Sequence, residues 1–178
     1  MPNAADPSSG STSSSSSPLT PRRSAESAAE MVQVVLPNDA NPLGFILGGT
    51  VMHLVDIAGA IASFRHARRR VVTAAVDDLV FLHPIKVGDL IILKARVTCT
   101  FSTSLEVQVD VFSEESLTGK RQLTSRAYLT FVAIDEAGNR VPVPPLLLES
   151  DEDGRVAAAA RVRREQRLQR RVLSQAQE

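Results

Sequence analysis

The chain of 178 residues has a single cysteine, Cys99, and no tryptophan. One cysteine excludes an internal disulfide and fits a reducing compartment, so we expect a cytoplasmic protein. Aromatic residues make up only 4% of the chain, which predicts a core of Val, Leu, Ile and Ala. The formal net charge is zero, which gives no electrostatic reason to expect nucleic acid or an anionic membrane as a partner.

Two further features are missing. No apolar run reaches the length that spans a bilayer, so we expect no membrane segment. No cluster of His, Cys and acidic residues has the spacing of metal ligands, so we expect no metal site. The pair Arg22-Arg23 is not followed by an apolar stretch, which argues against a secretory or twin-arginine signal. A Ser-rich organelle transit peptide is the open alternative for this end of the chain.

The composition divides the chain into three parts. Residues 1–26 are rich in Ser, Pro and Thr and include five consecutive serines at 13–17, so we expect this segment to be disordered. Residues 27–148 carry nearly all the patterned apolar content and form the expected domain. Residues 149–178 follow a proline-punctuated exit and predict a charged helix, because acids precede arginines in the order that suits a helix dipole.

Within the domain, one helix and several strands are expected. Residues 48–65 predict a long helix, preceded by a short strand at 31–36. After the helix, the β-type runs are residues 71–76 and 79–83 with a break at Asp77-Asp78, and then 90–97, 105–111 and 123–134. Apolar and polar residues alternate at 105–111, which is typical of a strand with one solvent-facing side. Because the turns are short, we expect an antiparallel meander with the helix packed against it.

The expected helix contains one unusual residue. It is apolar nearly all the way round, which is typical of a helix buried in a core. Asp56 lies near its middle, and a buried carboxylate is costly unless it is paired or in use. The polar loop at 39–44, which contains Asn41, and the pair Gly48-Gly49 come directly before it. We therefore interpret Asn41, Gly48, Gly49 and Asp56 as parts of one site.

An ordered set of short motifs resembles the hotdog-fold acyl-CoA thioesterases, in the acyl-CoA hydrolase branch. The motifs begin with Asp39-Ala40-Asn41-Pro42-Leu43-Gly44, Leu47-Gly48-Gly49 and Val55-Asp56-Ile57-Ala58. They continue with Val71-Val72-Thr73, Phe81-Leu82-His83-Pro84-Ile85, Val87-Gly88-Asp89, Thr103-Ser104, Thr130-Phe131-Val132-Ala133 and Val141-Pro142-Val143-Pro144. The resemblance spans roughly residues 30–146.

This resemblance implies an α+β hotdog fold, in which an antiparallel sheet wraps around one long helix. It implies a homodimer that joins two sheets and forms two active sites at its interface, with further assembly into a trimer of dimers. The implied substrate is a fatty or shorter acyl-CoA, hydrolysed to free acid and CoA without metal or organic cofactor. In such enzymes the matching Asn and Asp come from different subunits, so Asn41 of one chain would face Asp56 of the other.

The chemistry of thioester hydrolysis suggests a role for each residue. Asp56 is the candidate general base, or a nucleophile that forms a transient anhydride. The backbone N–H groups of Gly48 and Gly49 at the helix start suit an oxyanion. The amide of Asn41 can orient the water or the thioester carbonyl. His53, three residues before Asp56, could tune the carboxylate.

Each of these residues also has a purely structural interpretation. Asp56 could pair inside the core, Asn41 could form a turn before Pro42, and the glycines could serve tight helix–strand packing. His83, before Pro84, is expected to be structural.

Other residues could contact the nucleotide part of CoA. The basic run at 65–70 lies at the helix end, where arginines complement the helix dipole. Arg68, Arg69 and Arg70 are also candidates for binding the CoA phosphates. Weaker candidates for CoA contact are Thr103, Ser104 and Arg140.

Two alternatives to a thioesterase remain open. A non-catalytic acyl-CoA-binding or regulatory hotdog protein would not need a carboxylate at the thioester. A hotdog dehydratase would need a paired His and acid, for which only His53 and Asp56 are available.

Overall fold

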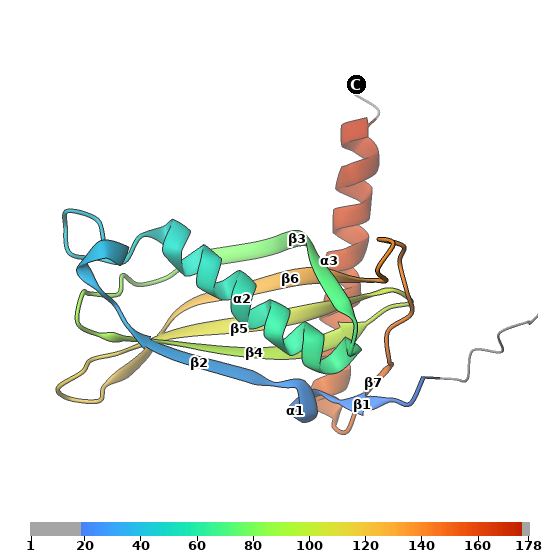
Figure 1. The fold of residues 1–178 in the computed structure, drawn as a ribbon, viewed down its shortest axis with the longest axis horizontal. Coiled ribbons are helices and arrows are strands. Elements are labelled where there is room, and N and C mark those ends of the chain that lie inside the picture. Colours follow the sequence, from blue (N-terminus) through green and yellow to red (C-terminus); the bar gives the residue numbers. More distant parts are fainter. Residues whose placement is uncertain (1–18, 176–178) are drawn as a thin grey trace, which may run out of the picture.

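The computed structural model describes residues 19–175 and shows one helix lying across a five-stranded antiparallel sheet (Figure 1). Helix α2 (Gly48–Ala67) packs on one face of the sheet, and helix α3 (Asp151–Gln175) crosses the other face. The strands are β2 (Ala29–Val34), β3 (Arg70–Phe81), β4 (Leu90–Thr100), β5 (Ser104–Glu114) and β6 (Arg121–Ile134). The α+β architecture predicted from the sequence, with its central helix and C-terminal helix, is confirmed. Within residues 19–175, no helix has the length and hydropathy needed to cross a bilayer.

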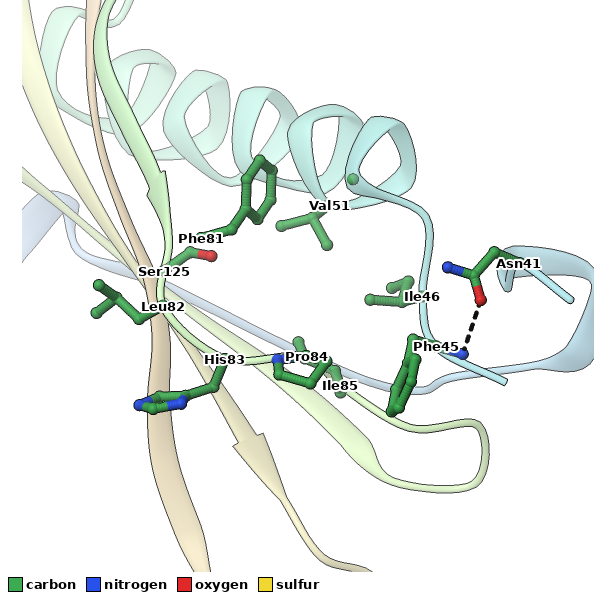
Figure 2. A pocket seen from close by; sticks show the side chains of 11 residues that line it. Asn41, Phe45, Ile46, Val51, Phe81, Leu82, His83, Pro84, Ile85 and Ser125 are labelled. Atoms are coloured by element: carbon green, nitrogen blue, oxygen red, sulfur yellow. Dashed lines mark hydrogen bonds between the residues drawn. The ribbon is translucent and has the colours of Figure 1, made fainter. Parts of the chain in front are cut away.

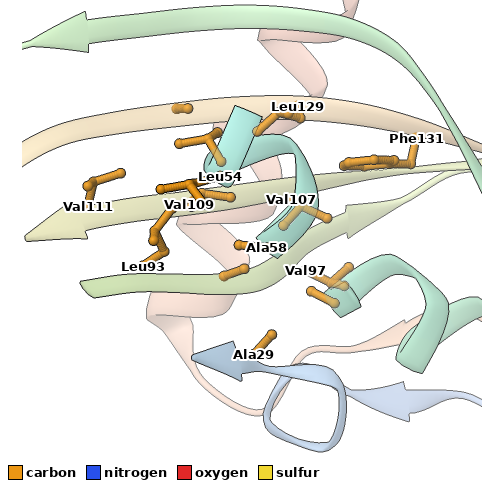
Figure 3. Close-up of a cluster of buried hydrophobic side chains, with 14 of the residues drawn as sticks. Ala29, Leu54, Ala58, Leu93, Val97, Val107, Val109, Val111, Leu129 and Phe131 are labelled. Carbon is orange, nitrogen blue, oxygen red and sulfur yellow. The ribbon is translucent and has the colours of Figure 1, made fainter. Parts of the chain in front are cut away.

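The core lies between α2 and the sheet and is almost entirely aliphatic (Figure 3). Small residues let the helix lie close to the strands. Ala58 and Ala62 are fully buried, and a Cβ added at Gly59 would lie 2.9 Å from the ring of Phe131, too close without displacing it. The sheet contributes alternate residues of three strands, including Leu93, Val97, Leu105, Val107, Val109 and Leu129. The expected core composition of Val, Leu, Ile and Ala is therefore confirmed.

The strand order is β2-β4-β5-β6-β3, which corrects the expected meander. Only β4, β5 and β6 follow one another as hairpins. Strand β3 pairs with β6 at the far edge, so residues 82–89 must cross the end of the sheet to reach β4. A short connection is compatible with either route, so the sequence pattern alone does not distinguish them. The expected break at Asp77-Asp78 is a register shift inside one continuous strand.

The outer face of β5 is not solvent-facing, which corrects the second strand expectation. Glu106 is 1% exposed because α3 covers it, and Gln108 is 5% exposed and hydrogen-bonds to Arg96 and Asp110 on the sheet. Arg163 of α3 donates to Glu106 at 2.8 Å and 3.0 Å, and the hydroxyl of Thr98 donates to the same carboxylate at 2.7 Å. The polar residues on this face of β5 thus lie under a helix and not in solvent. Helix α3 supplies the arginine that pairs with the buried carboxylate.

The end of the N-terminal segment is ordered where disorder was expected. Residues 1–18 lie outside the described residues, but Arg22–Arg23 form β1, which pairs in parallel with β7 (Leu146–Leu147). Helix α1 (Ser24–Ser27) follows directly.

A buried histidine fastens this segment to α2. His66 is fully buried; its Nε2 donates to the carbonyl of Pro144 at 3.1 Å and its Nδ1 lies 3.3 Å from Oγ of Ser27. Arg22 donates to the carbonyls of Arg65 and His66, at the last turn of α2. Burial lowers the pKa of His66, which favours the neutral ring. His66 is thus part of the packing, and only the arginines of the basic run are surface residues.

Deletion of residues 1–27 is expected to lower Tm by roughly 3–10 °C relative to a chain that begins at Leu19, since it leaves Nδ1 of His66 and two helix-end carbonyls without partners. Thermal unfolding of the two truncated chains measures the difference. Equal Tm values would contradict an anchoring role for Arg22 and Ser27.

Candidate functional site

Asn41 shapes the loop that precedes α2. Its Oδ1 accepts hydrogen bonds from the backbone N–H groups of Leu43 (3.0 Å) and Phe45 (3.2 Å). Gly44 adopts φ = 79°, a left-handed conformation that favours glycine. The oxygen of the amide thus serves the turn, as the structural interpretation expected. The amide nitrogen points into the adjacent pocket and has no acceptor within residues 19–175, so it can donate to a ligand (Figure 2).

The start of α2 is open. The first N–H groups of a helix have no partner within the helix. A Cβ placed at Gly49 would meet no atom within 4 Å, and one at Gly48 would reach only ordinary contact with the ring of Phe81, at 3.4 Å. Tight packing within this chain therefore does not require either glycine. The two residues leave the helix start accessible to a ligand or to another chain.

A pocket of about 300 Å³ lies between the helix start and the crossing segment 82–85 (Figure 2). Its walls are mainly apolar, with the amide of Asn41 and the side chains of His83 and Ser125 as polar groups. The lining residues are Asn41, Phe45, Ile46, Gly48, Val51, Phe81, Leu82, His83, Pro84, Ile85 and Ser125. The structure therefore brings together Asn41 and Gly48, but none of the acids within residues 19–175 lines the pocket.

Asp56 lies elsewhere on the helix. It is two turns beyond Gly48, a separation of roughly 12 Å along the axis. Its Oδ1 accepts a hydrogen bond of 2.6 Å from the hydroxyl of Thr73 on β3. Thr73 was not identified as a candidate from the sequence, because no local pattern shows which strand residue faces the helix at Asp56.

The helix is not buried all the way round, which corrects the expectation for α2. Asp56 is partly exposed, and Met52 and Phe64 are 48% and 46% exposed. The sheet covers only one side of the helix, so the other side of this apolar helix is left uncovered in a single chain. His53 is exposed one turn before Asp56.

Strand β3, beside Asp56, is a sheet edge whose outer side pairs with no other strand of residues 19–175, and it carries exposed apolar side chains. Val72, Val76, Val80 and Phe81 are 45–51% exposed. An apolar, unpaired edge next to an uncovered apolar helix face is typical of an interface between protein chains. In a single copy of the chain the candidate residues therefore fall into two separate groups, Asn41 with Gly48 at one place and Asp56 with Thr73 at another.

The candidate CoA-contact residues gather at the opposite end of α2. Arg68 ends the helix in a left-handed conformation, and Arg70 forms an ion pair of 3.6 Å with Glu136. Arg70 pairs with Ile134, and Ile134 bridges to Arg140. The residues Thr103, Ser104 and Arg69 adjoin the same strand ends. Within one chain this cluster lies roughly 30 Å from the helix start, the length of a 20-residue helix.

The described part of the chain contains no group of His, Cys, Asp and Glu that could hold a metal ion. The donors at the site are amide, hydroxyl, carboxylate and backbone N–H groups. Such groups can bind an acyl carbonyl, activate water and stabilise an oxyanion.

Comparison with known proteins identifies clear relatives. Residues 43–120 match the model of the Thioesterase superfamily. A Bacillus subtilis protein, the uncharacterized acyl-CoA thioester hydrolase YkhA, is 38% identical over 151 residues, which cover 85% of this chain and 88% of the relative. The crystal structure of an apo-hexameric acyl-CoA thioesterase matches with a TM-score of 0.83 and 39% identity, over 87% of this chain and 99% of that one.

A Staphylococcus aureus acyl-CoA hydrolase, solved with butyryl-CoA and CoA, matches with a TM-score of 0.81 and 35% identity, over 88% of this chain and 95% of that one. Variants of that hydrolase have also been solved in which an Asn, an Asp or a Thr is replaced by Ala. In that hydrolase the Asp follows the Asn by 15 residues, and the Thr follows the Asp by 17 residues. Asn41, Asp56 and Thr73 have the same two separations.

Proposed function

Because this chain belongs to the Thioesterase superfamily and has the hotdog fold, we propose that it hydrolyses acyl-CoA thioesters to the free carboxylic acid and CoA. The observation that carries this proposal is the pairing of Asp56 with Thr73 on the uncovered face of α2. A thioester-binding protein without turnover has no use for a carboxylate held in this way. Relatives that this chain matches over most of their length are acyl-CoA hydrolases by name, which supports the same reaction.

In the proposed reaction, water attacks the thioester carbonyl carbon and Asp56 accepts its proton. The hydroxyl of Thr73 holds Oδ1 and leaves Oδ2 to meet the water. The alternative, in which Asp56 itself attacks and a mixed anhydride is then hydrolysed, uses the same geometry. In both routes the carbon–sulfur bond breaks, and the CoA thiolate leaves and takes up a proton.

The negative charge that develops on the thioester oxygen requires donors. The free Nδ2 of Asn41 and the open backbone N–H groups of Gly48 and Gly49 are the proposed donors. Because the Oδ1 of Asn41 is held by two backbone N–H groups, its nitrogen has a defined direction. The apolar walls of the 300 Å³ pocket are the proposed beginning of the acyl site.

The proposed active unit is a homodimer, in which the β3 edges of two chains pair and join two sheets. This arrangement would cover the exposed residues of β3 and α2 and would place Asp56 of one chain at Asn41 of the other. The apo-hexameric relative supports further assembly, which we propose to be a trimer of dimers. A cytoplasmic location remains a prediction from the single, buried Cys99.

The proposed function is tested by thiol release from acyl-CoA substrates of increasing chain length. We expect turnover with at least one chain length and no requirement for added metal or cofactor. Tight binding of acyl-CoA without thiol release would instead support the non-catalytic alternative.

Replacement of Thr73 by Ala is expected to lower kcat about tenfold, because Asp56 would lose the hydrogen bond that orients it. Thr73→Ser keeps the hydroxyl and should retain most of the activity. Equal losses for both variants would indicate a packing defect, since only the alanine variant removes the donor. Steady-state kinetics with one acyl-CoA measures both.

The arginines at the end of α2 are expected to act on binding. Replacement of Arg68, Arg69 and Arg70 by Ala should raise KM for acyl-CoA and leave kcat near the wild-type value, because these side chains are exposed and distant from the helix start. The effect should shrink as the salt concentration rises. The screening length for exposed charges is about 10 Å at 0.1 M and becomes shorter at higher salt. A short thioester without the nucleotide is the control, and an equal rise in its KM would favour the helix-capping interpretation.

A further inference from the structure

Helix α3 crosses the strands and continues past the free edge of the sheet (Figure 1). It begins over β4, where Ala157 and Ala160 pack against Cys99. It then passes over β5 and β6 and reaches β3, the edge strand, at Arg167. From Arg167 to Gln175 the helix advances roughly 12 Å, a distance of about two strand spacings. Its last two turns therefore lie beyond the edge of the sheet in this chain.

Two arginines on the sheet-facing side of α3 bind acids on successive parts of the sheet. Arg163 forms an ion pair of 2.8 Å with Glu106 on β5, and its guanidinium lies 3.7 Å above the ring of Tyr128 on β6. Arg167, one turn later, forms an ion pair with Asp77 on β3. Both acids are buried by these contacts, at 2% and 5% side-chain exposure. The spacing of four residues keeps both arginines on one side of the helix.

Arg171 lies four residues after Arg167, on the same side of α3 and beyond β3. It is exposed and forms no ion pair with any residue in the range 19–175. Leu168 and Val172, next to it on α3, are 43% and 65% exposed. A cation and two apolar side chains are thus placed over the position that another strand would occupy if the sheet were extended.

The edge strand offers a matching acid. Asp78 on β3 is opposite Tyr128, so its side chain lies on the same face of the sheet as α3. It is exposed and, among the described residues, makes no side-chain hydrogen bond or ion pair. Its neighbour Asp77 is already held by Arg167. A second copy of the chain, paired at β3 about a two-fold axis close to Asp77 and Asp78, would therefore present a free carboxylate under Arg171.

We propose that Arg171 of one copy forms an ion pair with Asp78 of the partner subunit, so that each α3 bridges the joint between the two sheets. The inference rests on the edge-to-edge dimer proposed above. Two-fold symmetry makes the contact reciprocal, so each dimer contains it twice. Leu168 and Val172 pack against the partner subunit beside this ion pair. Helix α3 thereby has a second role besides covering its own sheet, which is to hold the dimer together.

Charge reversal tests this contact. The variants Arg171→Glu and Asp78→Arg are each expected to raise the dissociation constant of the assembly about tenfold, since each places two like-charge pairs in the dimer. The double variant restores opposite charges and should recover affinity near that of the wild type. Mass photometry over a dilution series measures the assembly. Arg170→Glu, with the same charge change one residue away on the helix, is the matched control and should have little effect.

Affinity in the double variant that is no better than in the single variants would overturn the ion pair, as would unchanged assembly in both single variants. Arg171→Gln removes the charge without adding an acid to the helix and should give a smaller loss of affinity. Ala74→Pro in the edge strand tests the dimer separately, because it should disrupt assembly whatever α3 does. Thiol release by the wild-type protein tests the proposed function, so a failed charge swap in an active enzyme refutes only the α3 contact.

Discussion

Replacement of Asp56 by Asn is expected to lower kcat roughly 10²–10⁴-fold, the usual contribution of a general base. The amide is isosteric with the carboxylate and can still accept the hydrogen bond from Thr73, so the fold and assembly should be retained. It cannot accept the proton of the attacking water or form an anhydride. Thiol release under saturating acyl-CoA measures the loss.

The control for this variant is Asp151→Asn, which makes the same change at an exposed acid in the first turn of α3. It should keep wild-type kcat. Far-ultraviolet circular dichroism and size determination should show that both variants are folded and assembled. Near-wild-type kcat in a folded Asp56→Asn protein would remove Asp56 from the mechanism and favour the interpretation of Asp56 as a structural residue.

Mixing two inactive proteins, Asn41→Ala and Asp56→Asn, is expected to restore about a quarter of wild-type activity. If the subunits exchange at random, half of the dimers are mixed, and each mixed dimer has one of its two sites intact. The physical basis is that a single chain separates Asn41 and Asp56 by roughly two helical turns plus the entry loop, too far for both to act on one thioester. Mass spectrometry of differently labelled subunits verifies the exchange.

The matched control mixes Asn41→Ala with a chain that carries both substitutions. No combination of these subunits contains an intact site, so activity should stay at the level of the single variant. If exchange is complete and the first mixture is also inactive, the site is not shared between subunits. Activity of isolated monomers would lead to the same conclusion.

Local patterns in the sequence were sufficient for the main elements and for four of the proposed site residues. The helix at 48–65, the hairpins after residue 90 and the helix from Asp151 all follow from periodicity, turn residues and charge order. The order of Asn41, Gly48, Gly49 and Asp56 could be predicted as a group because loop, helix start and helix are consecutive. Each of these features depends on residues that are neighbours along the chain.

Contacts between distant residues decided the rest. The position of β3 at the sheet edge, the hydrogen bond from Thr73 to Asp56 and the anchoring of Ser27 at His66 join residues 17 or more positions apart. The buried state of Glu106 depends on Arg163, which lies 57 residues away. A sequence pattern records which residues prefer burial, but it does not record which element covers them. That choice depends on how the helices and strands pack, and it determines that the candidate residues of one chain fall into two separate groups.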